Sequence, residues 1–426
     1  MSRIRRVRYV VLALLCAMYF ITYIDRTNIS VAGTTIAHDL HLSKVELGLI
    51  FSAFSYPYAL LQLPGGFAGD LLGARVGLGI VGGIWAGATL ATGFGRSFVQ
   101  LFVTRFLLGL GESAAFPTAT RAMASWMPPT ERGLAQGVVH SAARLGGAVA
   151  VPIVVFFVLL WGWQSSFFAL GAASLVWVVL FLLLYRGDPR QDRRVGAQEQ
   201  AEIGEQPLRA SPRAPWRALV AALWPVTLCD FCYGWGLWVF LTWLPGYLQE
   251  DRGFNLESLA LFAALPLLAG VVGDTAGGVL SDQVLRRTGN LRLARTWQLG
   301  ACLTLSAVFI VPAAVVGSPV LAVVLLSASF FFLELNNAVL WTIPMDVAPE
   351  YSGTAGGLMN TGFGVAGIIS PVVFGWLIQQ TRGWEVPFFA TGALMVMGAI
   401  VAVALVRPDR RVTSPAPLHE VAHAVR

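Results

Sequence analysis

The sequence predicts an all-α membrane protein with twelve transmembrane helices in two pseudo-symmetric six-helix bundles. Three observations lead there. Hydrophobic residues make up 56% of the 426 residues and charged residues only 12%, against roughly 25% charged residues in a soluble domain. Apolar runs of about 20 residues, long enough to cross a bilayer as helices, recur along the chain. A polar stretch near the middle separates the runs into two sets. So few charges would not cover a soluble surface, but they suit a surface that faces lipid.

The apolar runs are continuous rather than alternating, which argues against a β-barrel. The first run follows several arginines, as in a signal peptide, but no small-residue cleavage site precedes the charged pair Asp25 and Arg26. We therefore expect an uncleaved first helix. The candidate spans are 8–30, 46–68, 76–95, 98–122, 134–158, 164–185, 218–248, 257–280, 296–316, 319–344, 354–379 and 385–406.

The arginines predict the orientation, because positive residues concentrate in cytoplasmic loops. Placing the N-terminus inside puts most of them on the cytoplasmic side, including a central run from Arg186 to Arg217. We expect both termini to be cytoplasmic and the protein to lie in the inner (plasma) membrane. The predicted units are an N-terminal bundle (1–185), a flexible polar linker (186–217) and a C-terminal bundle with a short tail (218–426).

Two loop patterns occur once in each predicted half. Gly66 and Asp70 follow the second span, and Gly278 and Asp282 follow the eighth at the same spacing. A loop beginning at Pro128 after the fourth span likewise corresponds to one after the tenth. Paired repeats half a chain apart are typical of duplicated transporter folds.

Seven charged residues fall inside the predicted spans, where a charge at the bilayer centre costs at least ~2.5–3.5 kcal/mol and indicates a functional site. We place Asp274 and Arg121 instead near helix ends, with structural roles. Asp25 and Arg26 are adjacent, and adjacent side chains on a helix point about 100° apart. We therefore expect these two residues to face different partners. The seven are Asp25, Arg26, Arg105, Glu112, Arg144, Asp230 and Glu334.

Two acids and two bases in facing helices suit proton-coupled anion transport, because protonating an acid frees its basic partner for a substrate. Arg105 and Glu112 are two turns apart and share a helix face. Arg144 leaves two interpretations open: it binds a second acid group of the substrate, or it pairs with Glu334. Glu334 is a candidate third proton site or an acceptor for a substrate hydroxyl.

The motifs resemble the major facilitator superfamily, and within it the anion:cation symporter branch. Gly66, Asp70, Gly73 and Arg75 resemble its cytoplasmic signature, although Leu71 and Ala74 stand where the family often has basic residues. The resemblance implies that Asp25 and Glu112 are protonatable, that Arg26 binds substrate, and that Arg105 takes part in coupling. It also implies substrate contacts from four further residues, namely Tyr23, Tyr58, Trp341 and Asn360.

We therefore expect a proton-coupled symporter that imports a small organic anion, such as a sugar acid or related hydroxy-carboxylate, by alternating access. The alternatives are an organic-anion or organic-phosphate exchanger and a drug/proton antiporter of the same fold. We find no nucleophile–base set and no metal-ligand spacing, so we expect neither an enzyme nor a metal or organic cofactor; protons are the coupling ion. The arginines are too scattered for nucleic acid, and we expect a monomer in the lipid bilayer.

Overall fold

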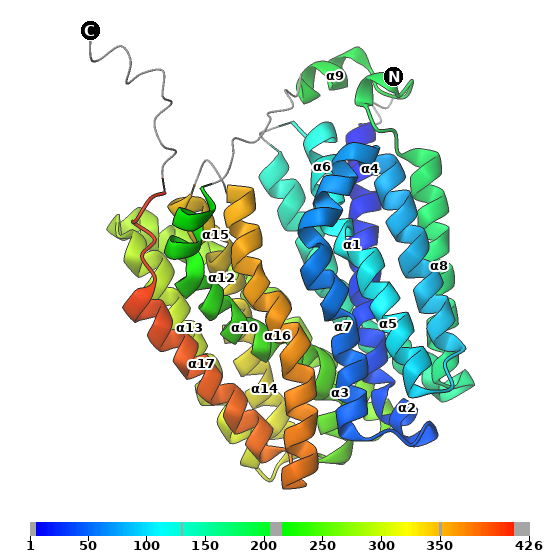
Figure 1. The fold of residues 1–426 in the computed structure, drawn as a ribbon, viewed down its shortest axis with the longest axis vertical. Coiled ribbons are helices and arrows are strands. Elements are labelled where there is room, and N and C mark those ends of the chain that lie inside the picture. Colours follow the sequence, from blue (N-terminus) through cyan, green and yellow to red (C-terminus); the bar gives the residue numbers. More distant parts are fainter. Residues whose placement is uncertain (1–5, 129–130, 205–214, 349–351, 413–426) are drawn as a thin grey trace.

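The computed structural model describes residues 6–128, 131–204, 215–348 and 352–412, and it contains helices but no strand within these ranges (Figure 1). The side chains of 62–63, 65–71, 124, 132–134, 136 and 352–353 also lie outside the description. Eleven described helical segments are long and apolar enough to cross a membrane. The protein is thus an all-α, multi-pass membrane protein.

The N-terminal bundle follows the predicted order of spans. Within α4 the glycine Gly73 has a φ of +76°, a conformation that suits glycine because it lacks a Cβ, and there the chain turns from the second predicted span into the third. The second span falls in α3 and the first part of α4, outside the eleven. The helices are α1 (Val7–Val31), α2 (Gly33–Asp39), α3 (Lys44–Ala53), α4 (Ser55–Gly93), α5 (Phe98–Ser113), α6 (Ala115–Trp126), α7 (Arg132–Trp161) and α8 (Trp163–Leu184).

The C-terminal bundle lies beside the first, as Figure 1 shows. A short π-helix, η2, begins its third span. Its elements are α10 (Trp216–Glu250), α11 (Leu256–Phe262), α12 (Ala264–Thr288), η2 (Leu293–Trp297), α13 (Gln298–Val315), α14 (Pro319–Glu334), α15 (Asn337–Val347), α16 (Ser352–Thr381) and α17 (Glu385–Leu405).

Two predicted spans, the fourth and the tenth, are interrupted at corresponding places. The fourth consists of α5 and α6, with the break at Ala114. The tenth consists of α14 and α15, with the break at Leu335 and Asn336. A carboxylate lies within two residues before each break, Glu112 in the first bundle and Glu334 in the second. The two bundles thus repeat a charged residue as well as a fold.

The first part of the linker is ordered, although its composition predicted a flexible segment. It contains the short helices η1 (Pro189–Gln191) and α9 (Ala197–Ile203). Glu199 accepts hydrogen bonds from the backbone N–H groups of Val7 (3.1 Å) and Arg8 (2.9 Å) at the start of α1. The buried Arg8 guanidinium pairs with Glu202 and Glu131 at 2.6 and 3.0 Å. The first N–H groups of a helix have no hydrogen-bond acceptor within that helix. Glu199 of α9 supplies acceptors for two of these groups at the start of α1.

The two bundles meet most closely at the end of the molecule that carries α2 and α3. A Cβ on Gly48 would lie 2.5 Å from the Pro371 carbonyl oxygen, and a Cβ on Gly375 would lie 2.5 Å from that of Lys44. Lys44 also forms an ion pair with Glu250 of the other bundle. At the opposite end, where α9 lies, the ribbons of the two bundles diverge (Figure 1).

Candidate functional site

Arg26 lies on α1 within a buried ring of aromatic side chains. Its Nε donates to Glu112 Oε2 on α5 over 2.7 Å, and the two side chains are only 5% and 0% exposed. Guanidinium groups bind favourably over aromatic faces, more strongly where water is excluded. The Arg26 Cζ lies 5.0, 4.8, 4.6 and 5.1 Å from the ring centroids of Tyr23, Phe54, Tyr58 and Phe116.

Part of the Arg26 guanidinium forms no hydrogen bond within the aromatic ring of side chains. Arg26 Nη2 is buried and has no hydrogen-bond partner among the described residues, and the same holds for Glu112 Oε1. A buried donor without a partner costs about 1–3 kcal/mol. The pair therefore retains a cationic donor that an incoming anion would satisfy.

Asp25 points away from Arg26, as adjacent positions on a helix require. Its Oδ2 accepts from Ser174 Oγ of α8 over 3.3 Å, while its backbone carbonyl accepts from Arg105 Nη1 over 3.2 Å. The Arg105 Cζ also lies 5.5 Å from the Phe54 ring centroid. The four charged residues expected to couple proton and substrate are thus buried together in the N-terminal bundle.

Arg144 on α7 reaches across to the other bundle. Its Nη2 lies 3.1 Å from Glu334 Oε2 on α14, and its Nε lies 3.5 Å from Asp274 Oδ2 on α12. Asn337 donates to the second oxygen of Asp274 over 2.9 Å. The pairing with Glu334, one of two interpretations that the sequence left open, is present in this conformation. Arg144, Asp274 and Glu334 form what we call the inter-bundle cluster.

Asp274 is a residue whose place the sequence analysis misjudged. The apolar run ends near Leu280, which put Asp274 close to a helix end, but α12 continues through polar residues to Thr288. Asp274 therefore lies in the middle part of α12. The available signal was the surrounding glycines: a Cβ on Gly273 would lie 2.3 Å from the Phe331 carbonyl oxygen, and such close helix packing marks a buried interface.

Tyr23 lies close to both Arg26 and Arg144. Its ring centroid is 5.0 Å from Arg26 Cζ and 5.7 Å from Arg144 Cζ. Close packing of α7 on α1 produces this arrangement, since a Cβ on Gly146 would lie 2.3 Å from the Phe20 carbonyl oxygen. Two cationic groups therefore share one aromatic side chain.

The other predicted residues divide between the bundles. Tyr58 stacks on Phe54 at a centroid distance of 5.1 Å and belongs to the ring around Arg26. Trp341 lies on α15, 40% exposed, where a Cβ on Gly356 of α16 would lie 3.2 Å from its ring. Asn360 lies on α16 and is half-buried. The structure thus brings Tyr23 and Tyr58 to Arg26 and places Trp341 and Asn360 in the other bundle.

Asp230 has a structural partner. Its Oδ2 accepts from the backbone N–H of Phe363 over 2.9 Å, which ties α10 to α16. The two helices are very close there, because a Cβ on Gly362 would lie 2.1 Å from the Thr227 carbonyl oxygen. This contact gives the buried Asp230 carboxylate a hydrogen-bond partner between the two helices.

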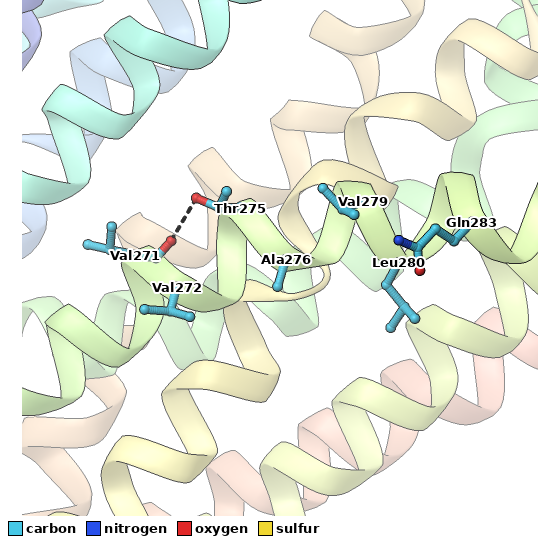
Figure 2. Close-up of a pocket in the computed structure, with 7 residues that line it drawn as sticks. All are labelled: Val271, Val272, Thr275, Ala276, Val279, Leu280 and Gln283. Carbon is cyan, nitrogen blue, oxygen red and sulfur yellow. Dashed lines mark hydrogen bonds between the residues drawn. The ribbon is translucent and has the colours of Figure 1, made fainter.

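Two surface grooves are nearly free of polar groups. The groove in Figure 2 runs along α12 and has a volume of about 520 Å³; the Thr275 hydroxyl within it donates to the Val271 carbonyl at 3.0 Å. The second, of about 390 Å³, lies between α10 and α16. No group of three or more potential metal ligands occurs within the described ranges. The charged clusters, not these grooves, are the candidate site.

Comparison with known proteins gives consistent matches. The family model described as Major Facilitator Superfamily matches residues 15–371 and 292–425. The chain is 52% identical over 425 residues to the probable sulfoacetate transporter SauU of Cupriavidus necator, covering 99% of each chain. It is 34% identical over 391 residues to the hexuronate transporter of Bacillus subtilis, covering 91% of this chain and 92% of the other.

The helical arrangement also matches a solved structure. A bacterial homologue of the human lysosomal transporter Spinster, in an inward-facing and unoccupied conformation, superposes with a TM-score of 0.80 at 18% identity, over 96% of this chain and 100% of that one. At this identity the likeness shows the fold alone.

Proposed function

The chain belongs to the major facilitator superfamily, and from that premise we propose that it is a proton-coupled symporter importing a small organic anion by alternating access. The family and the named relatives are transporters, not enzymes. The observation that carries the proposal is the buried pair of Arg26 and Glu112 inside its aromatic ring.

Arg26 is the anchor for the anion in this proposal. Its partly unsatisfied guanidinium lies in a dry environment, where a charge-assisted hydrogen bond is strong. The flat faces of Tyr23 and Tyr58 flank the position that the acid group would take, so they would contact the substrate. Trp341 and Asn360 would contact it from the C-terminal bundle when the two bundles close around it.

Glu112 is the proposed proton site. An anion that binds Arg26 competes with the Glu112 carboxylate, and an ionised carboxylate left buried without a partner is strongly unfavourable. Protonation removes that cost. Substrate and proton therefore favour each other's binding, which is the coupling a symporter requires. Asp25 and Arg105, packed in the same bundle, would pass or stabilise the same proton.

The named relatives support an organic acid as substrate. Sulfoacetate and hexuronate, the compounds in the names of the two relatives, both carry an acid group next to further polar atoms. The shared requirement is a cation for the acid group, and Arg26 provides it. The cage of aromatic rings suits a small molecule rather than a polymer.

The contacts between the bundles support an inward-facing state. The closed end carries Lys44 and Glu250, and the open end carries α9 of the linker. With both termini cytoplasmic, as the arginines predict, the open end faces the cytoplasm. We propose the bacterial plasma membrane as the location and a monomer as the transporting unit.

Uptake into proteoliposomes tests this function. Purified protein is reconstituted, and uptake of labelled sulfoacetate or a hexuronate is followed with and without an inward proton gradient. The symporter proposal expects accumulation above the outside concentration only with the gradient. Uptake that needs an internal anion and ignores the pH difference would identify an exchanger instead. An exposed arginine variant, Arg96→Gln, serves as the matched control for Arg26→Gln.

A further inference from the structure

We propose that the substrate is a short dianion, with acid groups on both sides of a one-atom spacer, that binds Arg26 through one acid group and Arg144 through the other. This inference rests on the proposed function and adds the substrate class. The juxtaposition of the two guanidinium groups, whose Cζ atoms lie 5.0 and 5.7 Å from the Tyr23 ring centroid, carries it.

The separation of the arginines limits the length of the substrate. Both Cζ atoms are measured from the same ring centroid, at 5.0 and 5.7 Å, so they lie no farther apart than those two distances together. A guanidinium carbon lies about 4 Å from the central atom of an acid group that it binds through two hydrogen bonds. The span left between the acid groups is then about 3 Å at most, which corresponds to a single methylene.

The charges around Arg144 explain how a second acid group fits. Arg144 is held by Glu334 and Asp274. A substrate acid group on Arg144 takes the place of the Glu334 carboxylate, just as one on Arg26 takes the place of Glu112. Both arginines belong to the N-terminal bundle, whereas Glu334 and Asp274 belong to the other. Substrate binding therefore also releases an ionic contact between the bundles.

The exchange sets the number of protons. Each displaced carboxylate is buried and needs a proton once its arginine is taken. The groups facing Glu334 are Arg144, Asp274 and the Tyr233 hydroxyl at 3.4 Å; those in the cluster around Glu112 are Arg26, Arg105 and Asp25. Two negative charges on the substrate thus enter with two protons, one on Glu112 and one on Glu334. The net charge moved is zero.

The first experiment compares binding of paired ligands to detergent-purified full-length protein by calorimetry. Sulfoacetate and malonate are the dianions; acetate and methanesulfonate are their monoanion counterparts. The dianions should bind about 10- to 100-fold more tightly, the size of one additional hydrogen-bonded charge contact. Arg144→Gln should remove that preference, so that each dianion binds with about the affinity of its monoanion counterpart. Arg96→Gln should change neither.

A second variant controls for damage to the fold. The double variant Arg144→Gln with Glu334→Gln contains no unpaired charge at that position, so it should melt near the wild type and still lack the dianion preference. A dianion preference that persists in this double variant would overturn the proposal. Equal loss of mono- and dianion binding in the single variant, restored in the double variant, would overturn it as well.

The third experiment measures stoichiometry in proteoliposomes. Uptake of a dianion should be independent of a potassium-diffusion potential, because two protons balance two charges. Dependence on an inside-negative or inside-positive potential would contradict the predicted proton count. Proton-driven uptake of monoanions without any preference for dianions would leave the symporter proposal standing and reject this inference alone. Failure of every organic anion to be taken up would reject both.

Discussion

Arg26 and Arg144 each pair with a glutamate that precedes a helix break, yet the two pairs differ in what they connect. Arg26 and Glu112 belong to the same bundle, and their side chains are 5% and 0% exposed. Arg144 is 13% exposed and pairs with Glu334 of the other bundle. The first pair sits inside aromatic rings; the second shares its arginine with Asp274, which is itself bound by Asn337.

The difference indicates that the two pairs have different functions in transport. A pair within one bundle keeps its geometry while the bundles rock against each other, so it suits a fixed substrate site. A pair between bundles has to change when they move, so its free energy biases the conformational equilibrium. Arg144 therefore contributes to the conformational bias in addition to its proposed contact with the substrate, whereas Arg26 contributes to substrate binding alone, and mutations should separate these contributions.

The largest effect is expected for Arg26→Gln. Removing one partner of a buried charge pair costs 2–5 kcal/mol or more, so we expect substrate affinity to fall at least 100-fold. Glu112 takes a proton in the variant, and the melting temperature should change little. Calorimetry and a melting curve check both parts. If the variant binds substrate as the wild type does, Arg26 is not the anchor.

Glu112→Gln should retain binding and lose proton-driven accumulation. The amide imitates the protonated acid, so Arg26 stays available and exchange of labelled for unlabelled substrate continues. Electroneutral co-transport of one proton with a monoanion concentrates the monoanion about tenfold per pH unit, and for a monoanion that ratio should fall to one. Glu257→Gln, at an exposed acid on α11, is the control. Undiminished proton-driven accumulation by Glu112→Gln would show that Glu112 is not the proton-coupling site.

Arg144→Gln should destabilise the inward-facing state because Glu334 and Asp274 lose their cation. Breaking a buried ion pair costs about 3–5 kcal/mol, and the partial exposure of Arg144 places the expected loss at the lower end. Thermal melting in detergent measures it, with Glu334→Gln added in a double-mutant cycle. Strict additivity of the two changes would show that the inter-bundle cluster is not coupled.

The smallest effect is expected at the closed end. Lys44 and Glu250 also connect the bundles, but their side chains are 25% and 26% exposed. Exposed pairs contribute about 0–1 kcal/mol. Lys44→Gln should therefore shift the ratio of inward- to outward-facing molecules only a few-fold, and less at high salt. Distance measurements between spin labels on α3 and α16 would report the shift. A change as large as that for Arg144→Gln would contradict this ranking.

The fold was predictable because a helix that crosses a lipid bilayer needs about 20 mostly apolar residues, and such runs are visible in the sequence. Each predicted span lies in helical structure, with the second and third sharing α4 across Gly73, and the major facilitator fold is confirmed by the family match and the structural likeness. The seven intramembrane charges were also visible, since charges are conspicuous in apolar runs. The divergence of Asp25 and Arg26 followed from helix geometry alone.

Pairings between distant helices were not predictable. Nothing in the sequence around Arg144 indicates which acid of the other bundle it meets, because that depends on how two bundles approach in three dimensions. Asp274 was misplaced because hydropathy ends a span where polar residues begin, whereas backbone hydrogen bonds carry α12 on to Thr288. The helix α9 was missed for a similar reason, since its stability comes from contacts with α1.

That contact of α9 with α1 has a consequence for how the protein is made. Glu199 accepts hydrogen bonds from Val7 and Arg8, whose backbone groups are synthesised about 190 residues earlier. The cap therefore cannot form until the ribosome has synthesised the first six spans and the linker as far as Glu199. The N-terminal bundle can then be sealed as a unit during translation, with Arg8 neutralised by Glu202 and Glu131.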